Sequence, residues 1–422
     1  MPKTFRPYEP DQMLLLPPSV KEWVPDGDLA HVISDVVDVL DLCEIEAVYE
    51  DELRGYPPYN PRMMTKLWLY AYAVGIRSCR KLGQLVQRDV GFMMLAAGNQ
   101  PDFRTLNSFR LRHLEALSGL FVQVVRLCEK KGLVKLRHVA VDGTRVKANA
   151  SKHSAMSYGR MKQEEARIRA EVEAYFTECD RVDAEEDRLY GPDQRGDELP
   201  EELRTAERRR RAIKEAMAEL EREAKEAGKE APEEKAQRNF TDPESRIMKG
   251  SEGAFIQGYN AQAAVDASSQ VIVAASLTTS AADAGQLVPI VDLIRDHLGV
   301  TPQQVSADAG YCSETNLEAL EQRGVDAYVA TGRMSRSYRC PPAPRGRIPR
   351  GLSRRELMKR RLMTKRGRAT YRLRQQVVEP VFGQIRNKGL IRLWLRGEAK
   401  ARGEWLLHCI GHNLCKLQAV WA

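Results

Sequence analysis

Three acidic residues in this chain have both the side chain and the setting for metal-assisted chemistry. Asp142 closes a short apolar stretch, Asp308 closes another, and Glu379 lies in a very basic segment. Hard divalent cations prefer oxygen ligands, and two of them about 4 Å apart can hold the attacking and leaving oxygens of a phosphodiester displacement. Together the three carboxylates predict a two-metal site for phosphoryl transfer, although each of them alone is weak evidence.

The tetrapeptide Ala-Asp-Ala-Gly occurs twice, so the second acid has a competitor. Asp283 lies in a loop rich in Thr, Ser and Ala. We expect it to cap the helix that runs through Leu287. Asp308 instead ends a strand pattern, which places its carboxylate beside Asp142 if the two strands are neighbours. We therefore assign the site to Asp308.

The charge around Glu379 indicates the substrate class. Residues 333–402 contain 22 lysines and arginines and three acids, a balance of +19. Such a concentration predicts binding to a polyanion, here DNA, although a solvated basic loop is the alternative for residues 333–368. Arg386 follows Glu379 by two helical turns on the same face, where it can meet a phosphate. Pro380 predicts that Glu379 lies near a helix start or a kink.

Composition limits the classes of protein that fit. A chain of 422 residues exceeds one ordinary core, so we expect two or three domains. Its net charge is +8, and its eight cysteines are irregularly spaced, which favours a reduced intracellular protein over a disulfide framework. Apolar runs of about 18 residues are missing from the sequence, so no membrane span is expected.

Residues 31–128 have a helical pattern of apolar residues, interrupted by short breaks. Short helices with tight breaks are compatible with a helix-turn-helix-like DNA reader, and a plain helical bundle is an equally good interpretation. In the first interpretation the helix carrying Arg104, Arg110, Arg112 and His113 faces the DNA groove.

Residues 160–235 are charged and have apolar residues seven apart, as at Met161 and Ile168 and again at Ile213 and Leu220. A turn-rich break separates the two stretches, which predicts an antiparallel helical hairpin whose seam serves packing.

The remaining segments predict an α/β fold with a mixed sheet. Strand patterns occur at 137–142, 254–266, 270–277, 305–308 and 327–330, with helices at 287–298 and 314–322. Residues 145–149 are expected to form a hairpin partner for the first strand, which places Asp142 at a strand tip.

Several motifs make the chain resemble a known family. They are YNPRMM (59–64), YAYAVGIRS (70–78), PDFRT (101–105), DGTRVKANAS (142–151), TDPESR (241–246), YNAQ (259–262), DAGY (308–311) and VEPVFGQIR (378–386). They resemble the DDE transposases of bacterial insertion sequences, in particular the branch with an N-terminal helical domain and a charged helical insertion after the first Asp.

The resemblance implies an RNase H-like catalytic core in which Asp142, Asp308 and Glu379 coordinate two Mg²⁺ ions, for which Mn²⁺ can substitute. It also implies DNA-positioning side chains around the Glu. Arg386 stands where the family has a Lys, which keeps the charge but changes the geometry. Tyr371 and Arg374 lie one residue further upstream than in the commonest spacing. Predicted DNA contacts are therefore Tyr371, Arg374, Arg386, Lys388 and Lys147, together with Arg104, Arg110 and Arg112 of the helical region.

We expect four regions along the chain. They are a helical DNA-binding domain (1–130), an RNase H-like catalytic domain (133–150, 245–332 and 365–422), an inserted hairpin (151–244) and a basic loop (333–364). The expected activity is metal-dependent cleavage and strand transfer of double-stranded DNA at the ends of a mobile element. Such an enzyme holds two ends together, so we expect a homodimer or larger assembly, acting in the cytoplasm on nucleoid DNA.

Two other functions keep the same motifs. One is a catalytically silent DNA-binding relic, and the other is a metal-dependent nuclease without strand transfer. A zinc cluster around His408, Cys409, His412 and Cys415 is a further alternative, but the apolar periodicity there favours a packed core helix.

Overall fold

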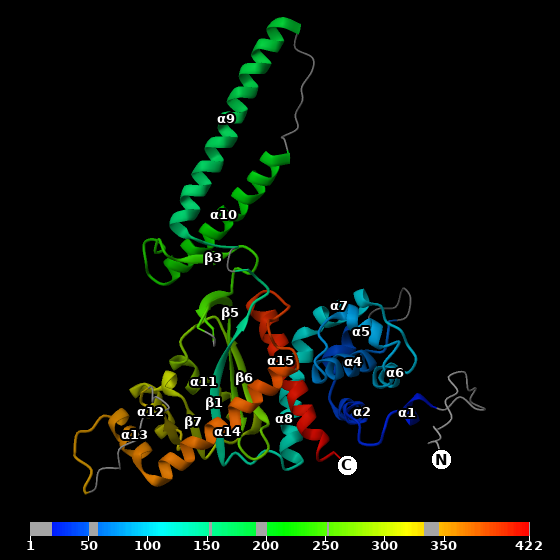
Figure 1. Cartoon of the computed structure of the whole chain (residues 1–422), viewed down its shortest axis with the longest axis vertical. Helices are drawn as coiled ribbons and strands as arrows, with labels where there is room; N and C mark the ends of the chain where they lie inside the picture. Colours follow the sequence, from blue (N-terminus) through cyan, green and yellow to red (C-terminus); the bar gives the residue numbers. More distant parts are fainter. Residues whose placement is uncertain are drawn as a thin grey trace, which may run out of the picture. The chain divides into compact units, whose positions relative to one another are not determined.

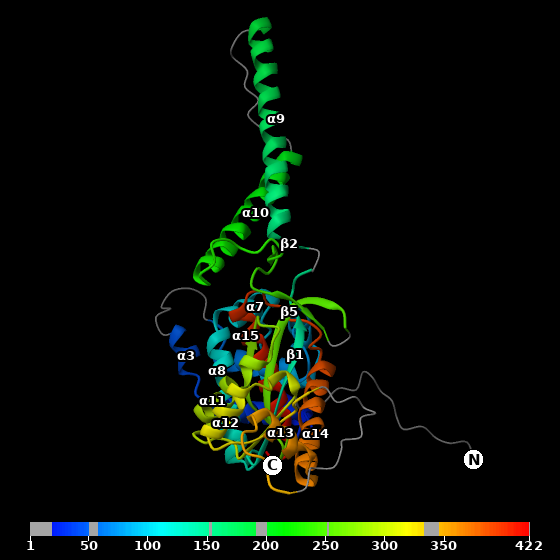
Figure 2. The same cartoon turned by 90° about the vertical axis from the view of Figure 1, so that its left-hand side faces the viewer.

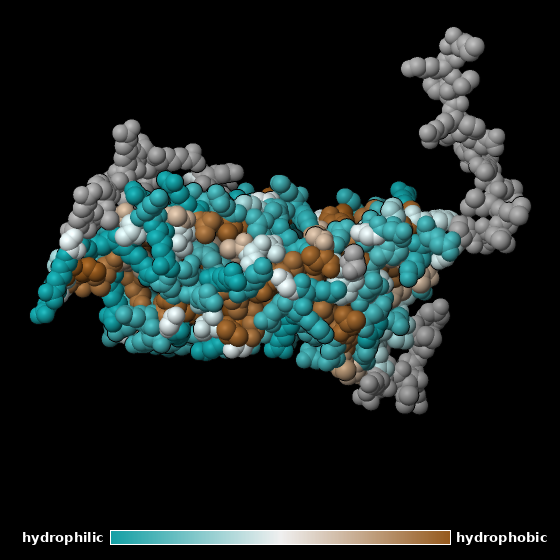
Figure 3. All heavy atoms as spheres, turned by 90° about the horizontal axis from the view of Figure 1, so that it is seen from below, coloured by the Kyte–Doolittle hydropathy of each residue, from teal (hydrophilic) through white to brown (hydrophobic). Residues whose placement is uncertain are grey.

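The protein is described from a computed structural model that covers residues 19–49, 58–151, 154–190, 201–250, 253–332 and 346–421. The chain divides into two compact units. The first comprises Met1–Val134, Asn387–Gly389 and Leu407–Ala422, and the second comprises Lys135–Arg386 and Leu390–Leu406. Across the residues described, helices are too short or too polar to cross a membrane. Hydrophilic residues cover most of the face seen in Figure 3, and hydrophobic residues form smaller patches between them.

The first unit is built from helices, as the sequence predicted. Their bounds are α1 Val20–Trp23, α2 Leu29–Val39, α3 Cys43–Glu46, α4 Pro61–Ala73, α5 Cys79–Leu85, α6 Val90–Ala96, α7 Phe103–Arg112 and α8 Leu114–Lys130. Side-chain caps begin several of them: Asn60 accepts from the backbone of α4, and Asp102 accepts from that of α7. Trp68 on α4 and Phe121 on α8 are buried in the core.

The last part of this unit is Leu407–Ala422, which includes the C-terminal half of helix α15 (Glu398–Gln418). His408 and Cys409 are buried, and the His408 ring stands edge-on to Tyr72 at 5.1 Å between centroids. A side chain at Gly411 would come within 2.8 Å of the Ala73 backbone nitrogen, so glycine permits the close approach of α15 to α4. The prediction of a packed core helix is confirmed.

The second unit contains a mixed sheet, as predicted. The strands are β1 His138–Lys147, β4 Arg246–Lys249, β5 Phe255–Asp266, β6 Ile272–Thr278, β7 Gln304–Ala307 and β8 Asp326–Val329. Within the described residues these six strands are ordered β4-β5-β1-β7-β8, with β6 also paired to β5. β1 is antiparallel to β5 and parallel to β7, and β7 is parallel to β8. The hairpin predicted over 254–277 is confirmed as β5 and β6.

One prediction about β1 is wrong. Residues 145–149 do not form a hairpin partner, because β1 continues through Asp142 and Gly143 to Lys147. The reason is the length of β5, which pairs with β1 from Asp266 back to Gly258 and so extends the ladder beyond the apolar stretch. Asp142 is therefore in mid-strand, opposite Ala263, and not at a strand tip.

Helices cover both faces of the sheet. They are α11 Leu287–Leu298 and α12 Glu314–Gln322, which match the predicted ranges, then α13 Arg354–Met363 and α14 Lys365–Asn387. Figure 2 shows α14 on one side of β1, with α11 and α12 on the other.

Two predictions about the basic segment need correction. The sequence predicted Glu379 near a helix start or at a kink, and the helix start is wrong, because Glu379 and Pro380 both lie inside α14. A proline inside a helix costs about 3 kcal/mol. Five apolar side chains of α14 are buried (Val377, Val378, Val381, Phe382 and Ile385), and each contributes roughly 1.5–3 kcal/mol, so the helix continues. The basic loop was predicted over 333–364, of which residues 333–345 lie outside the described residues. The prediction is wrong for residues 354–363, which form α13. This helix begins with a capping box of Ser353 and Glu356.

The predicted helical hairpin is confirmed as α9 (Tyr158–Tyr190) and α10 (Glu201–Glu226), which lie side by side in Figure 1. The short strands β2 (Ala155–Ser157) and β3 (Gln237–Asn239) pair antiparallel at its base. The seam is apolar, as expected, and its buried residues are Tyr158, Met161, Ile168, Ile213, Ala216 and Leu220.

Candidate active site

The sheet places the first two predicted acids side by side. β1 and β7 are parallel neighbours, and Val141 is paired with Ala307. Asp142 is the next residue of β1, and Asp308 is the first residue after the end of β7. Alternation of side chains along a strand then determines that Asp142 and Thr144 share one face of β1, while Gly143 and Arg145 belong to the other.

Arg374 brings Glu379 to the same place. Its Nη1 donates to Asp142 Oδ2 at 2.8 Å, and its Nη2 lies 3.8 Å from Glu379 Oε1. Arg374 and Glu379 are both on α14, which covers the Asp142 face of the sheet. The side chain of Arg374 is 10% exposed and that of Glu379 is 55% exposed, so the cluster opens to solvent on the Glu379 side.

The electrostatic state of Asp142 follows from its surroundings. Burial raises the pKa of its carboxyl group to about 6. The Arg374 guanidinium acts in the opposite direction, and the negative charge of Asp308 raises the pKa further. A group whose charged form is disfavoured by burial and by a like charge gains from a nearby cation, so this carboxyl group is suited to a cationic ligand.

Tyr371 lies one helical turn before Arg374, and the guanidinium carbon is 5.9 Å from the centre of its ring. Burial raises the pKa of the Tyr371 hydroxyl, Arg374 lowers it, and the charges of Asp308 and Asp142 raise it. The two acids therefore act on the same phenol, which places Tyr371 at the edge of the cluster.

The donor set fits divalent metal ions. Asp142, Asp308 and Glu379 offer the carboxylate oxygens that hard cations prefer, and the raised pKa of Asp142 marks a place where positive charge is stabilising. Arg374 supplies that charge between Asp142 and Glu379. Among the residues described, no three His, Cys, Asp or Glu side chains are already grouped closely enough to hold a metal ion.

Sequence reasoning missed the role of Asp283. We predicted a helix cap, but its side chain makes no capping hydrogen bond. Instead its Oδ1 accepts from Asn260 Nδ2 at 2.7 Å and from Gln262 Nε2 at 3.0 Å, and its Oδ2 accepts from Arg145 Nη2 at 2.9 Å. Polar residues at alternate positions of a buried strand, as at 260 and 262, are a signal that the sequence carried and that could have indicated this network.

Two comparisons with protein families identify the chain. Residues 226–414 match the family model described as "Transposase DDE domain", and residues 18–112 match that of "Transposase domain (DUF772)". The chain belongs to the DDE transposases of insertion sequences. No curated protein and no solved structure matches it. Asp308 and Glu379 lie inside the first matched range, whereas Asp142 lies between the two.

Membership of the family explains the sheet. A transposase DDE domain has an RNase H-like fold, and the order β6-β5-β1-β7-β8, with β5 and β6 antiparallel and β7 and β8 parallel to β1, is the mixed sheet of this transposase. Enzymes of this family bind DNA and use divalent metal ions.

Two predicted DNA contacts of the transposase, Arg386 and Lys147, line one cavity near the end of β1. Arg386 is exposed on α14 and donates from Nη2 to Thr144 Oγ1 at 2.6 Å. Lys147 is exposed at the end of β1. Both side chains line a cavity of about 210 Å³ whose other walls include Ile256 and Phe382.

The predicted contacts in the helical unit differ from one another. Arg104 and Arg112 are exposed. Arg110 is not available to DNA, because it is only 3% exposed, donates to the Arg77 carbonyl at 3.0 Å and stacks over Trp68 at 4.4 Å. We therefore correct the prediction for Arg110, whose role is to hold the core of its unit.

Lys388 has a partner in the protein as well. Its Nζ donates to Cys415 Sγ at 2.7 Å, in the part of the first unit formed by the C-terminal segments. The side chain is half-buried and not fully exposed, so its reach toward DNA is smaller than the sequence suggested.

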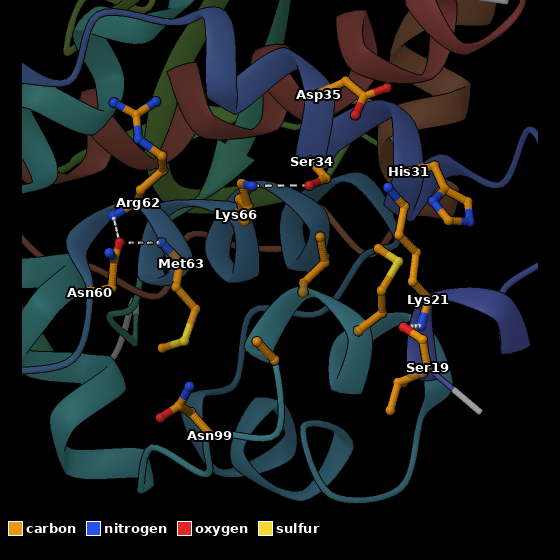
Figure 4. A pocket seen from close by; sticks show the side chains of 14 residues that line it. Ser19, Lys21, His31, Ser34, Asp35, Asn60, Arg62, Met63, Lys66 and Asn99 are labelled. Atoms are coloured by element: carbon orange, nitrogen blue, oxygen red, sulfur yellow. Dashed lines mark hydrogen bonds between the residues drawn. The ribbon is translucent and has the colours of Figure 1, made fainter. Parts of the chain in front are cut away.

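The first unit of the transposase contains a larger cavity, of about 620 Å³, formed by residues of α1, α2, α4 and α6 (Figure 4). Arg62 and Lys66 enter it from α4 and are held by the protein itself. Arg62 donates to the Val37 carbonyl at 2.8 Å, and Lys66 donates to Ser34 at 2.9 Å. The described residues that line this cavity include one acid, Asp35, so a group of acids like that proposed on the sheet is not found among them.

Proposed function

We propose that this transposase catalyses metal-dependent DNA strand cleavage and strand transfer at the ends of an insertion sequence, with Asp142, Asp308 and Glu379 as the metal-ligating acids. One observation carries the proposal. Asp142 and Asp308 follow paired residues on adjacent parallel strands, and Arg374 joins Asp142 to Glu379. Asp308 and Glu379, 166 or more residues away from Asp142 in sequence, are thus connected to it by strand pairing and by Arg374.

The three acids would hold two Mg²⁺ ions, for which Mn²⁺ can substitute. When bound, such ions supply Lewis-acid activation of a water or a DNA 3′-hydroxyl and stabilisation of the leaving oxygen.

The cationic side chains of the site orient the DNA backbone. An arginine has five N–H donors in a planar fork that matches a phosphate. The contact of Arg386 with Thr144 uses one Nη group and holds the guanidinium beside the Asp142 face of β1. Arg374, fixed between two acids, places positive charge where charge develops on the scissile phosphate.

The DNA is expected to be double-stranded and to contact both units. Arg104 and Arg112 are exposed on α7, Lys147 and Arg386 are exposed on β1 and α14, and Tyr371 is half-buried. Since two ends must be joined in one reaction, we expect a homodimer or a larger assembly on DNA, acting in the cytoplasm on the nucleoid.

The decisive experiment uses duplexes that carry the inverted repeats flanking the gene, together with a target plasmid. We expect Mg²⁺-dependent cleavage at the repeat ends and joined products, both lost on addition of EDTA. Cuts without joined products would instead indicate a nuclease, and end binding without cuts would indicate a silent relic.

The site assignment is tested with Asp142→Asn, Asp308→Asn and Glu379→Gln. Each should reduce cleavage by about 10³-fold or more, because ligands that act as one unit fail together. Binding of the repeat duplex, measured by gel shift, should persist. Glu398→Gln is the matched control, since Glu398 is an acid of the same basic segment whose side chain pairs with Arg402, at 3.0 Å. Retained cleavage in a triad variant removes that residue from the site.

A further inference from the structure

Asp283 is the centre of a buried polar network beside the proposed active site. Its side chain is 11% exposed and makes three charge-assisted contacts, with Asn260 Nδ2, Gln262 Nε2 and Arg145 Nη2, at 2.7–3.0 Å. Arg145 also donates to the Ala281 carbonyl at 2.8 Å, which closes the loop around Asp283. Burying an unpaired carboxylate costs several kcal/mol of folding free energy, and these contacts offset that cost.

The network reaches the loop that carries Asp308. Tyr311, three residues after Asp308, donates its hydroxyl to Gln262 Oε1, while Gln262 Nε2 donates to Asp283. Burial raises the pKa of Tyr311 well above its usual range, and the charges of Asp283, Asp142 and Asp308 raise it further, so the phenol remains a hydrogen-bond donor. Asp283, Gln262 and Tyr311 therefore form one chain of hydrogen bonds.

A second connection runs through backbone groups. Asn316 Nδ2 donates to the Ala284 carbonyl at 2.6 Å and to the Tyr311 carbonyl at 2.8 Å. The loop of Asp283 and the loop of Asp308 are thus joined at two places.

The network also reaches the strand that carries Asp142. Gly143 is paired with Gln262, and a Cβ at Gly143 would lie 2.4 Å from Gln262 Nε2 and 3.1 Å from Asp283 Oδ1. The absence of a side chain at Gly143 lets the network pack directly against β1 behind Asp142.

Gly310 has the same role after β7, in the short helix η4 (Ala309–Tyr311). A Cβ there would lie 3.1 Å from Asp308 Oδ1 and 3.3 Å from Asp283 Oδ2, so the two carboxylates lie on either side of this glycine.

We propose that Asp283 is a positioning residue for strand cleavage, which acts through Gln262 and Tyr311 to hold the Asp308 loop in register with Asp142. The inference rests on the proposed function and deepens it. Asp283 belongs to the face of the sheet that bears Arg145 and Gln262, opposite to that of Asp142 and Arg374. Because it lies on that opposite face, beside Gln262 and Gly143, it supports the proposed metal-ligating acids from behind and is not itself proposed as a ligand.

The expected effect is on the spacing of two carboxylates. Loss of a residue that supports metal ligands typically costs 10–100-fold in metal affinity or activity. In Asp283→Asn one of the two acceptor oxygens becomes an N–H donor, so either Arg145 or the pair Asn260 and Gln262 loses its acceptor and the loop is free to shift. We expect about a 10–100-fold weaker Mn²⁺ affinity and a similar loss of cleavage.

The experiment titrates the full-length protein with Mn²⁺ by isothermal calorimetry, without DNA, and measures cleavage separately. Asp292→Asn is the matched control, because Asp292 pairs with Arg323 through two contacts of 2.8 Å in the same unit but away from the acids. The inference requires Asp283→Asn to lose affinity and Asp292→Asn to keep it. Wild-type Mn²⁺ affinity in Asp283→Asn overturns it.

A double-mutant cycle tests the route. Tyr311→Phe removes one hydroxyl from the hydrogen-bond chain, with little risk to folding, and should weaken Mn²⁺ binding in the same direction. If both residues act through Gln262, the double variant is no worse than the weaker-binding single variant, whereas independent sites add. Additive losses overturn the route. If wild-type protein binds Mn²⁺ but cleaves no repeat duplex, the proposed function fails while the calorimetry still decides the role of Asp283.

Discussion

Helix α14, which carries Glu379, and the hairpin α9–α10 are both long and strongly charged, yet Arg374 of α14 and Arg167 of the hairpin have different kinds of partner. In the hairpin, Arg167 pairs with Glu164 at 3.0 Å, three residues away in sequence, and is 54% exposed. On α14, Arg374 pairs with Asp142 at 2.8 Å, 232 residues away, and is 10% exposed. The Arg167 pair is local and solvated, whereas the Arg374 pair is distant in sequence and buried.

Under the proposed function, the difference separates charge that is structural from charge that serves the reaction. Exposed pairs contribute about 0–1 kcal/mol each, so those of the hairpin solubilise helices that the apolar seam holds together. A buried charge costs more than its pairing returns unless it is compensated by good geometry. The pKa of Asp142, raised to about 6, indicates that its pairing does not fully offset the cost of burying its charge. Such a group is retained where chemistry requires it.

Among the changes that test this comparison of the two regions, the largest effect is expected for Arg374→Gln. Removing a buried cation that faces developing negative charge should lower the cleavage rate by about 10²–10³-fold. Arg374→Lys should recover part of the rate, because it keeps the charge but not the two-pronged contact with Asp142 and Glu379. Single-turnover cleavage of the repeat duplex measures both. Unchanged rates in both variants would contradict a functional role for the distant charges of α14.

Next in size is the loss of hairpin packing. Ile213 is 0% exposed in the seam, so Ile213→Ala should destabilise the hairpin by about 2–5 kcal/mol. Hydrogen exchange should speed up in α9 and α10, while the strands β1 and β7 keep their protection. Loss of protection in β1 would show that the hairpin and the sheet unfold as one unit, which would contradict the comparison of the hairpin and the sheet as two separate regions.

A smaller effect concerns pH. Below about pH 6 the carboxyl group of Asp142 is protonated in the metal-free protein, so Mn²⁺ affinity should fall about tenfold per pH unit. Because the folded pKa is raised, the folded state binds the proton more tightly than the unfolded state. The stability of the metal-free protein should therefore decrease as pH rises from about 4 to about 6.

Calorimetric titration and denaturant unfolding across this window test both statements. Arg374→Gln should move the inflection to higher pH, since Arg374 lowers the pKa of Asp142. A shift to lower pH would mean that another group controls the titration.

The smallest effect is expected for Arg167→Gln. Its pairs with Glu164 and Glu171 are local and exposed, so the free energy of unfolding should change by less than about 0.5 kcal/mol. Cleavage should be unchanged. A loss above 2 kcal/mol in urea unfolding would show that local pairs of the hairpin are as important as the distant pairs of α14.

Much of this protein is determined by its sequence alone. The seven-residue spacing of Met161 and Ile168, and of Ile213 and Leu220, predicted the hairpin seam. Helical periodicity is a local pattern, so it can be recognised without knowing the packing partner. The ranges of α11 and α12 were predicted for the same reason, and the family resemblance lay in short motifs that survive without coordinates.

Only the tertiary structure decided which charged groups meet. Asp142 proved to be in mid-strand because β5 pairs beyond it, Glu379 proved to be inside a helix because burial outweighs Pro380, and Arg110 proved to be buried over Trp68. Asp283 could not be distinguished from a cap, since its partners Asn260 and Gln262 reach it through strand pairing and loop closure. Side-chain identity and spacing are local properties, whereas proximity between residues far apart in sequence arises from packing, which no local pattern encodes.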